Sequence, residues 1–126
     1  MATHCMIGIE EESNGKITAS YCHYDGDIKG VGATLLQHYN TPELARKVAT
    51  GGYLSSLLPD YNESRKKAVH NECAEIHHGL TSFIQDMKYA DVKYVYIFRK
   101  GVWYTGIVDG CFDRRCLNGF SELESK

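Results

Sequence analysis

The segment from Val92 to Arg99 constrains the fold most strongly, because apolar and aromatic residues occupy both of its alternating sides. This pattern predicts a β-strand that lies in the middle of its sheet or is covered by a partner subunit. Lys100-Gly101 follows as a turn, and residues 102–108 alternate again. The two segments together predict an antiparallel hairpin near the end of the chain.

A second hairpin is predicted near the start of the chain. Residues 4–10 and 16–23 both alternate between two faces, which indicates two strands. Asn14-Gly15 lies between them, and both residues tolerate the positive φ of a tight hairpin turn. We therefore expect these two strands to pair in antiparallel fashion.

The middle of the chain is predicted to be mainly helical. Segments with helical apolar spacing are 31–39, 42–50 and 81–88. Thr41 can cap the second helix, and Pro42 suits its first position. The polar run 62–67 predicts a solvated face or loop, with an anion site as the alternative, and for 68–80 both a helix and an irregular excursion stay open. We predict an α+β fold, a small single domain over residues 1–126, with an antiparallel sheet from two hairpins and a helical middle segment.

Composition limits the classes of partner. The chain has 14 Lys and Arg against 16 Asp and Glu, a net charge of −2, which excludes a long nucleic-acid footprint but allows a small phosphorylated ligand. No apolar run is long enough to span a bilayer, and the first residues lack a signal-peptide pattern. We therefore expect a cytoplasmic protein whose five cysteines are free thiols.

The segment from Tyr21 to Gly32, between the first hairpin and the first helix, carries candidate ligand-binding chemistry. Its glycines allow sharp turns and a close approach to a ligand, and the start of the following helix attracts anions. An ordinary strand–turn–helix connection is the alternative. The candidate ligand-binding residues here are His23, Tyr24, Asp25 and Lys29.

A second candidate set lies around the last hairpin and beyond it. Aromatic side chains that can stack on a base are Tyr94, Tyr96, Phe98 and Trp103, and packing in the core is the equal alternative. Side chains that can make forked contacts with phosphate are Arg99, Arg114 and Arg115.

Metal and catalytic chemistry find weaker support in the spacing. Cys73 and His77 are four residues apart, but no second pair has zinc-ligand spacing. Cys22 and His23 are adjacent in a predicted strand and point to opposite faces, so the thiol and the imidazole cannot meet. We expect no metal, no cofactor and no enzymatic activity.

Several short motifs resemble those of the first family of phage anti-Thoeris proteins. They are Cys5-Met6-Ile7-Gly8-Ile9-Glu10, Ile17 to Tyr21, Tyr21-Cys22-His23-Tyr24-Asp25-Gly26 running to Val31-Gly32, Leu35-Leu36, His38-Tyr39 and Leu54-Ser55-Ser56-Leu57. The resemblance covers the first half of the chain well and the last hairpin loosely. Members of this family capture cyclic ADP-ribose isomers made by bacterial TIR-domain enzymes without degrading them. Some members also bind cyclic trinucleotides at a separate site in a hexamer.

The resemblance implies a homo-oligomer with ligands at subunit interfaces. It implies that Phe98 or a neighbouring tyrosine stacks on adenine, and that Arg114 or Arg115 with Lys29 contacts the pyrophosphate. Family members commonly carry Tyr-Pro after Asp-Gly, where this chain has Asp27-Ile28. The details of recognition in this loop are therefore expected to differ.

The resulting hypothesis is a phage immune-evasion protein in the host bacterial cytoplasm. It binds and sequesters cyclic nucleotide-derived signals without cleaving them, with no long nucleic acid and no membrane as a partner. One alternative is an enzyme that hydrolyses such signals, with His23 or His77 as the acid–base group. Another alternative is a structural oligomeric protein.

Overall fold

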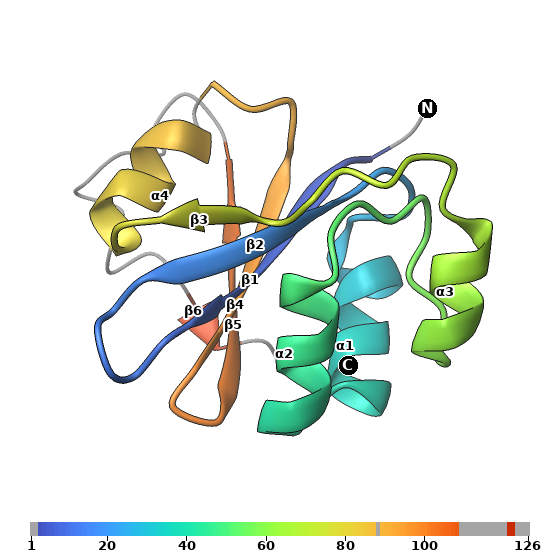
Figure 1. Cartoon of the computed structure of the whole chain (residues 1–126), viewed down its shortest axis with the longest axis horizontal. Helices are drawn as coiled ribbons and strands as arrows, with labels where there is room; N and C mark the ends of the chain where they lie inside the picture. Colours follow the sequence, from blue (N-terminus) through green and yellow to red (C-terminus); the bar gives the residue numbers. More distant parts are fainter. Residues whose placement is uncertain (1–2, 88, 109–120, 123–126) are drawn as a thin grey trace.

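A mixed six-stranded sheet forms the framework of the chain, with strand order β3-β2-β1-β4-β5-β6 (Figure 1). The computed structural model describes residues 3–87, 89–108 and 121–122. The strands are β1 (Cys5–Glu10), β2 (Ile17–Cys22), β3 (Glu75–His77), β4 (Tyr94–Arg99), β5 (Val102–Ile107) and β6 (Ser121–Glu122). The helices are η1 (Ile28–Gly32), α1 (Ala33–His38), α2 (Pro42–Thr50), α3 (Tyr61–Lys67) and α4 (Leu80–Met87).

Both predicted hairpins are confirmed. β1 pairs with β2, and β4 pairs with β5, in antiparallel register. The turn of the first hairpin has Gly15 at φ 73°, and the turn of the second has Lys100 at φ 50° and Gly101 at φ 81°. The second turn has two residues, both with the positive φ of a type I′ turn, whereas the first is a four-residue loop, 12–15, closed by a hydrogen bond from the Glu11 amide to the Lys16 carbonyl at 2.8 Å.

The two hairpins are joined differently from the prediction, although the α+β class is confirmed. β1 and β4 lie side by side in parallel, with Cys5 opposite Tyr94, so the sheet is mixed and not antiparallel throughout. Parallel neighbours need a long crossover connection, and the helical middle of the chain supplies it. This arrangement places β4 in the interior of the sheet, as its apolar character on both faces predicts.

Helices cover both faces of the sheet, with α2 and α4 on opposite sides of the strands (Figure 1). The face under α1 and α2 buries, among others, Ile7, Leu35, Val48, Tyr96 and Trp103. The face under α4 buries, among others, Met6, Ile17, Phe83, Ile84 and Ile97. Alternate residues of β1 and β4 therefore contribute to two separate parts of the core. Among the described residues, none of the helices has the length and apolar character of a membrane span.

The structure decides two segments in the middle of the chain. The charged run predicted as a solvated face or loop forms the helix α3, in which Ser64 is fully buried and its hydroxyl accepts a hydrogen bond from the Leu58 amide at 2.7 Å. The charges still face solvent, with Lys66 and Lys67 exposed. Residues 68–80 contain the short edge strand β3, which pairs with β2 through Ile17 opposite His77.

Replacing Thr41 with alanine is expected to lower the free energy of unfolding by about 1 kcal/mol. The Thr41 hydroxyl accepts a hydrogen bond from the Leu44 amide at 3.2 Å and so caps α2, as predicted. Urea denaturation followed by circular dichroism measures the change. Thr50→Ala is the matched control, because that hydroxyl bonds only the Arg46 carbonyl of its own helix. Equal stability of the two variants would contradict a capping role.

Candidate functional site

An open hollow of about 760 Å³ lies beside the first half of the segment Tyr21–Gly32. This volume falls in the range of about 300–1,000 Å³ that is common for small-molecule sites. Its aromatic lining consists of Tyr21, His23, Tyr24, Tyr53 and His70. Its polar and charged lining consists of Ser55, Ser56, Lys67, Glu72, Glu75 and Asp91. We call this site the aromatic hollow.

Backbone pairing brings the segment after α2 alongside the end of β2. The Leu54 amide donates to the Tyr21 carbonyl at 2.9 Å, and the His23 amide donates back to the Leu54 carbonyl at 3.0 Å. The Tyr24 amide donates to the Ser55 carbonyl at 2.9 Å. This pairing sets the Tyr21 and Tyr53 rings in a stack with centroids 5.7 Å apart. The stacked pair forms an aromatic surface at the hollow.

Two imidazoles are stacked at one side of the aromatic hollow. The rings of His4 and His23 have centroids 4.3 Å apart and an interplanar angle of 27°. His4 Nδ1 donates to the His23 carbonyl at 2.7 Å, and the Tyr21 hydroxyl lies 3.0 Å from His23 Nδ1. The Tyr24 ring meets His23 edge-on at 4.6 Å. His23 is thus fixed on three sides.

The Tyr21 hydroxyl stays protonated at neutral pH. Burial raises the pKa of Tyr21 to about 12, and the negative charge of Asp91 adds to the shift. A protonated phenol both donates and accepts hydrogen bonds, so Tyr21 can adapt to either protonation state of His23.

The described lining of the hollow carries more negative than positive charge. Lys67 is opposed by the carboxylates of Glu72, Glu75 and Asp91. Carboxylates accept hydrogen bonds from hydroxyl and amino groups, so they suit the sugar or the base of a nucleotide. Lys67 is the permanent cation of this lining and suits a phosphate.

The structure brings only part of the predicted loop set to the hollow. His23 and Tyr24 line it, whereas Asp25 and Lys29 are exposed outside its lining. The amides of Gly30 and Val31 are not free for the anion site predicted at this helix start, and η1 begins earlier, at Ile28. The Gly30 amide donates to the Asp27 carbonyl at 3.1 Å and the Val31 amide to the Asp25 carbonyl at 2.7 Å.

The predicted aromatic platform on β4 is wrong for its buried members, and the core alternative describes them. Tyr96 is 0% exposed, and its hydroxyl donates to the Gly26 carbonyl at 2.8 Å. Phe98 and Trp103 are 3% and 1% exposed and meet edge-to-face. Tyr94 is half-buried against the same part of the core. Rings packed under α1 and α2 have no free face for a base.

The predicted arginines do not reach the hollow in the part of the chain that the structure describes. Arg99 lies at the end of β4 away from Cys5 and Tyr94, and its Nε bonds the Glu10 carboxylate at 3.1 Å. Arg114 and Arg115 lie outside the described residues, so their role stays a prediction.

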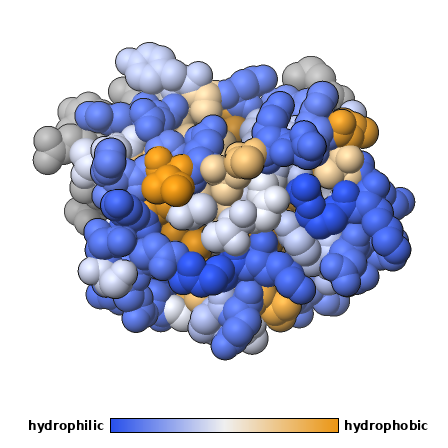
Figure 2. All heavy atoms as spheres, viewed as in Figure 1, coloured by the Kyte–Doolittle hydropathy of each residue, from blue (hydrophilic) through white to orange (hydrophobic). Residues whose placement is uncertain are grey.

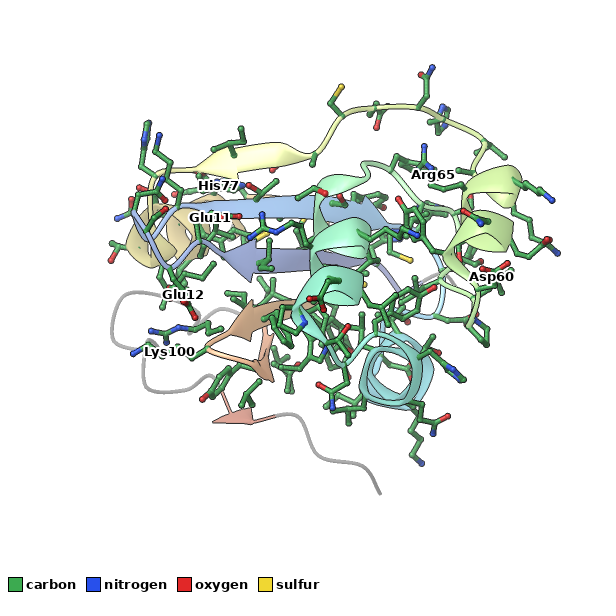
Figure 3. The ribbon with its side chains drawn as sticks, turned by 60° about the horizontal axis from the view of Figure 1, so that its bottom comes forward. Glu11, Glu12, Asp60, Arg65, His77 and Lys100 are labelled. Atoms are coloured by element: carbon green, nitrogen blue, oxygen red, sulfur yellow. The ribbon has the colours of Figure 1, made fainter. Side chains whose placement is uncertain are left out.

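His77, the other acid–base candidate, is buried and hydrogen-bonded within the fold. It is 7% exposed, and its two nitrogens lie 2.9 Å from the Asp86 carboxylate and 3.1 Å from the Glu75 carboxylate. Its ring packs on Phe83 of α4. Figure 3 shows His77 far from Arg65, on the side of the molecule that carries the Glu11 turn. Within residues 3–87, 89–108 and 121–122, no group of three potential ligands could hold a metal ion.

Sequence reasoning missed the half of the hollow that comes from later in the chain. Tyr53, His70 and Glu72 belong to segments without one clear period, and Lys67 belongs to the charged run for which an anion site is only the alternative. The Tyr53 amide donates to the Glu72 carbonyl at 2.9 Å, and the His70 ring meets Tyr53 edge-on at 5.0 Å. These contacts depend on tertiary structure, so no local spacing could have revealed them.

Comparison with family models, with curated proteins and with solved structures finds no match to this chain.

Proposed function

We propose that this protein binds a cyclic, adenine-containing nucleotide signal in the aromatic hollow and sequesters it without cleaving it. The observation that carries the proposal is the convergence of Tyr21, His23 and Tyr24 with Tyr53 on one concave site. The first three belong to the motif that resembles phage anti-Thoeris proteins. The same short segment therefore supports the proposal through its sequence and through its position.

The hollow offers a partner for each part of such a ligand. Tyr24 is 48% exposed and the Tyr21–Tyr53 stack is beside it, so a base can pack against tyrosine. Carboxylates at the hollow can accept hydrogen bonds from ribose hydroxyls, and Lys67 can contact phosphate. Sequestration needs nanomolar affinity, about −12 kcal/mol. The hollow is open, and a second copy of the chain would supply further contacts in the homo-oligomer that we propose.

The biological setting that we propose follows from this ligand class. A phage protein in the cytoplasm of its bacterial host can remove cyclic ADP-ribose isomers before they reach their receptor. Cyclic trinucleotides are a second class of signal that such a protein can bind. Sequestration needs affinity alone, so it requires no catalytic group at the hollow.

A binding-and-release experiment separates this function from its alternatives. Purified protein is titrated with cyclic ADP-ribose isomers and cyclic trinucleotides by calorimetry, and then denatured by heat. Mass spectrometry of the supernatant is expected to recover the bound ligand intact. Recovery of fragments would instead support a hydrolase in which His23 acts as acid–base, and His23→Gln would then stop the cleavage. No binding heat with any of these ligands would leave a structural oligomer.

Tyr24→Ala is expected to weaken binding by about tenfold or more, because stacking on a base contributes about 1–3 kcal/mol. The Tyr24 side chain is exposed at the hollow, so its removal should leave the fold intact. Tyr89→Ala is the matched control, since Tyr89 is 90% exposed and is not part of the lining. Calorimetry compares the two variants. Equal affinities would place the base elsewhere.

A further inference from the structure

We infer that the hydroxyl group of Tyr53 determines the base specificity of the aromatic hollow, by accepting a hydrogen bond from the exocyclic amino group of the ligand's adenine. This inference rests on the proposed function and deepens it. It assigns one chemical group of the ligand to one side chain. It also predicts that a base with a carbonyl group in place of the amino group binds less tightly.

The Tyr53 hydroxyl is a polar group that awaits a partner. Tyr53 lines the hollow and is 7% exposed. Within the part of the chain that the structure describes, its hydroxyl makes no hydrogen bond, and it is not sealed from solvent as the unpaired hydroxyls of Tyr61 and Thr105 are. A phenol that is more than nine-tenths buried, unpaired and open to the hollow is suited to pair with a ligand.

The other contacts of Tyr53 hold this hydroxyl in place. The Tyr53 amide donates to the Glu72 carbonyl at 2.9 Å, and the Tyr53 carbonyl accepts from the Arg65 guanidinium. The ring stacks on Tyr21 with centroids 5.7 Å apart and meets His70 edge-on at 5.0 Å. Backbone and ring are thus fixed before a ligand arrives, so binding immobilises little that is not already ordered.

The face of the base and its edge need different partners. Tyr24 is 48% exposed and offers a ring on which a base can stack. Stacking alone tolerates every base, because every base has a π-face. Discrimination between bases therefore requires a hydrogen bond to the edge, and a site built around such a bond rejects a base that cannot form it. Tyr53 supplies a fixed polar atom for this purpose.

The polar lining around Tyr53 favours a ligand group that carries hydrogens. The carboxylates of Glu72, Glu75 and Asp91 only accept hydrogen bonds. Lys67 only donates them. The amino group of adenine has two hydrogens, one for the Tyr53 oxygen and one for a second acceptor or a water molecule. A carbonyl oxygen at that position can meet only the hydroxyl hydrogen, and it faces the negative charge of the carboxylates. The lining therefore favours adenine over hypoxanthine.

Calorimetry with two cyclic ligands measures this preference. Cyclic inosine diphosphate ribose carries a carbonyl group where cyclic ADP-ribose carries the amino group, and the unaltered protein is expected to bind the adenine compound about tenfold more tightly. Tyr53→Phe keeps the ring and removes only the hydroxyl. It should weaken binding of cyclic ADP-ribose by about threefold to tenfold and reduce the preference by a similar factor. Tyr89→Phe, at a residue that is 90% exposed outside the lining, is the matched control and should keep both affinities.

The stability of the free protein distinguishes a ligand contact from a structural one. Because the Tyr53 hydroxyl has no partner among the described residues, Tyr53→Phe is expected to unfold at the same or a higher urea concentration than the unaltered protein. Tyr96→Phe is the matched control, since that hydroxyl donates to the Gly26 carbonyl at 2.8 Å and its loss should lower the midpoint. A lower midpoint for Tyr53→Phe would show that the hydroxyl serves the fold, and it would overturn the inference.

The outcomes separate this inference from the proposed function. Binding of cyclic ADP-ribose without a preference over the hypoxanthine compound, or with a preference that persists in Tyr53→Phe, overturns the inference and leaves the proposed function standing. Absence of binding by any cyclic adenine nucleotide overturns both.

Discussion

Trp103→Ala is expected to lower the free energy of unfolding by about 3–5 kcal/mol, the largest effect of any single substitution considered for this chain. The Trp103 side chain is 1% exposed and packs edge-to-face on Phe98 with centroids 5.2 Å apart. Its indole Nε1 donates to the Tyr39 carbonyl at 3.1 Å. Truncation therefore leaves a cavity under α1 and also removes the partner of a buried carbonyl.

Urea denaturation followed by far-ultraviolet circular dichroism measures this loss. Fluorescence is unsuitable, because Trp103 is the one tryptophan in the sequence. Trp103→Phe is the matched variant, since it keeps an aromatic ring and loses the indole donor. We expect it to be less destabilised than Trp103→Ala. If Trp103→Ala unfolded at the same urea concentration as the unaltered protein, the packing described for β5 would be wrong.

Gly52→Ala is expected to lower the free energy of unfolding by about 2–5 kcal/mol and to weaken ligand binding as well. Gly52 has φ 93°, and an added Cβ would lie 2.3 Å from the Glu72 carbonyl oxygen. Strain in the left-handed region and a clash with backbone therefore act together. Relief of the clash moves the segment at Glu72, which lines the aromatic hollow and receives the Tyr53 amide.

Gly79→Ala is the matched control for Gly52→Ala. A Cβ at Gly79 meets nothing within 4 Å, so this substitution should change stability by less than about 1 kcal/mol. Denaturation gives the stability of each variant, and calorimetry with the ligand gives its affinity. A Gly52→Ala protein with unchanged stability and affinity would show that the contact with Glu72 does not hold this wall of the hollow.

Local patterns predicted the elements that local forces determine. Alternation identified both hairpins, and Thr41 with Pro42 identified the start of α2, because side-chain period and capping act over a few residues. The parallel contact between β1 and β4 left no local pattern, since a parallel and an antiparallel pairing of these two strands would bury the same alternating residues. The sequence predicted the four strands of the two hairpins, but it predicted neither the short strands β3 and β6 nor how the hairpins join.

Alternation also leaves open what covers a face of a strand. Tyr94, Tyr96 and Phe98 were correctly placed on one face, but a row of aromatic rings fits a helix-covered core as well as a stacking platform. The helices α1 and α2 pack over this face and make it part of the core, and they come from a distant part of the chain. Local signals are similarly unable to show that the amides of Gly30 and Val31 bond to loop carbonyls.

The candidate site was half predictable for the same reason. His23 and Tyr24 stood out because they occur among glycines between a strand and a helix. Tyr53 and His70 did not stand out, because their segments become part of the site only through tertiary contacts, such as the pairing of the Leu54 amide with the Tyr21 carbonyl at the end of β2.

The face of the molecule shown in Figure 1 is mainly hydrophilic. Figure 2 shows its apolar side chains in small separate groups, so this face offers no extended apolar patch.

The parallel contact between β1 and β4 has a consequence for biosynthesis. Glu10 and Arg99, which form a hydrogen bond across these strands, are 89 positions apart. On the ribosome, the first hairpin emerges long before the strand that completes its apolar edge. During that interval the nascent chain exposes an unpaired edge, which is a template for intermolecular pairing. We therefore expect the nascent chain to be prone to intermolecular pairing until residues 94–99 have emerged and paired with β1.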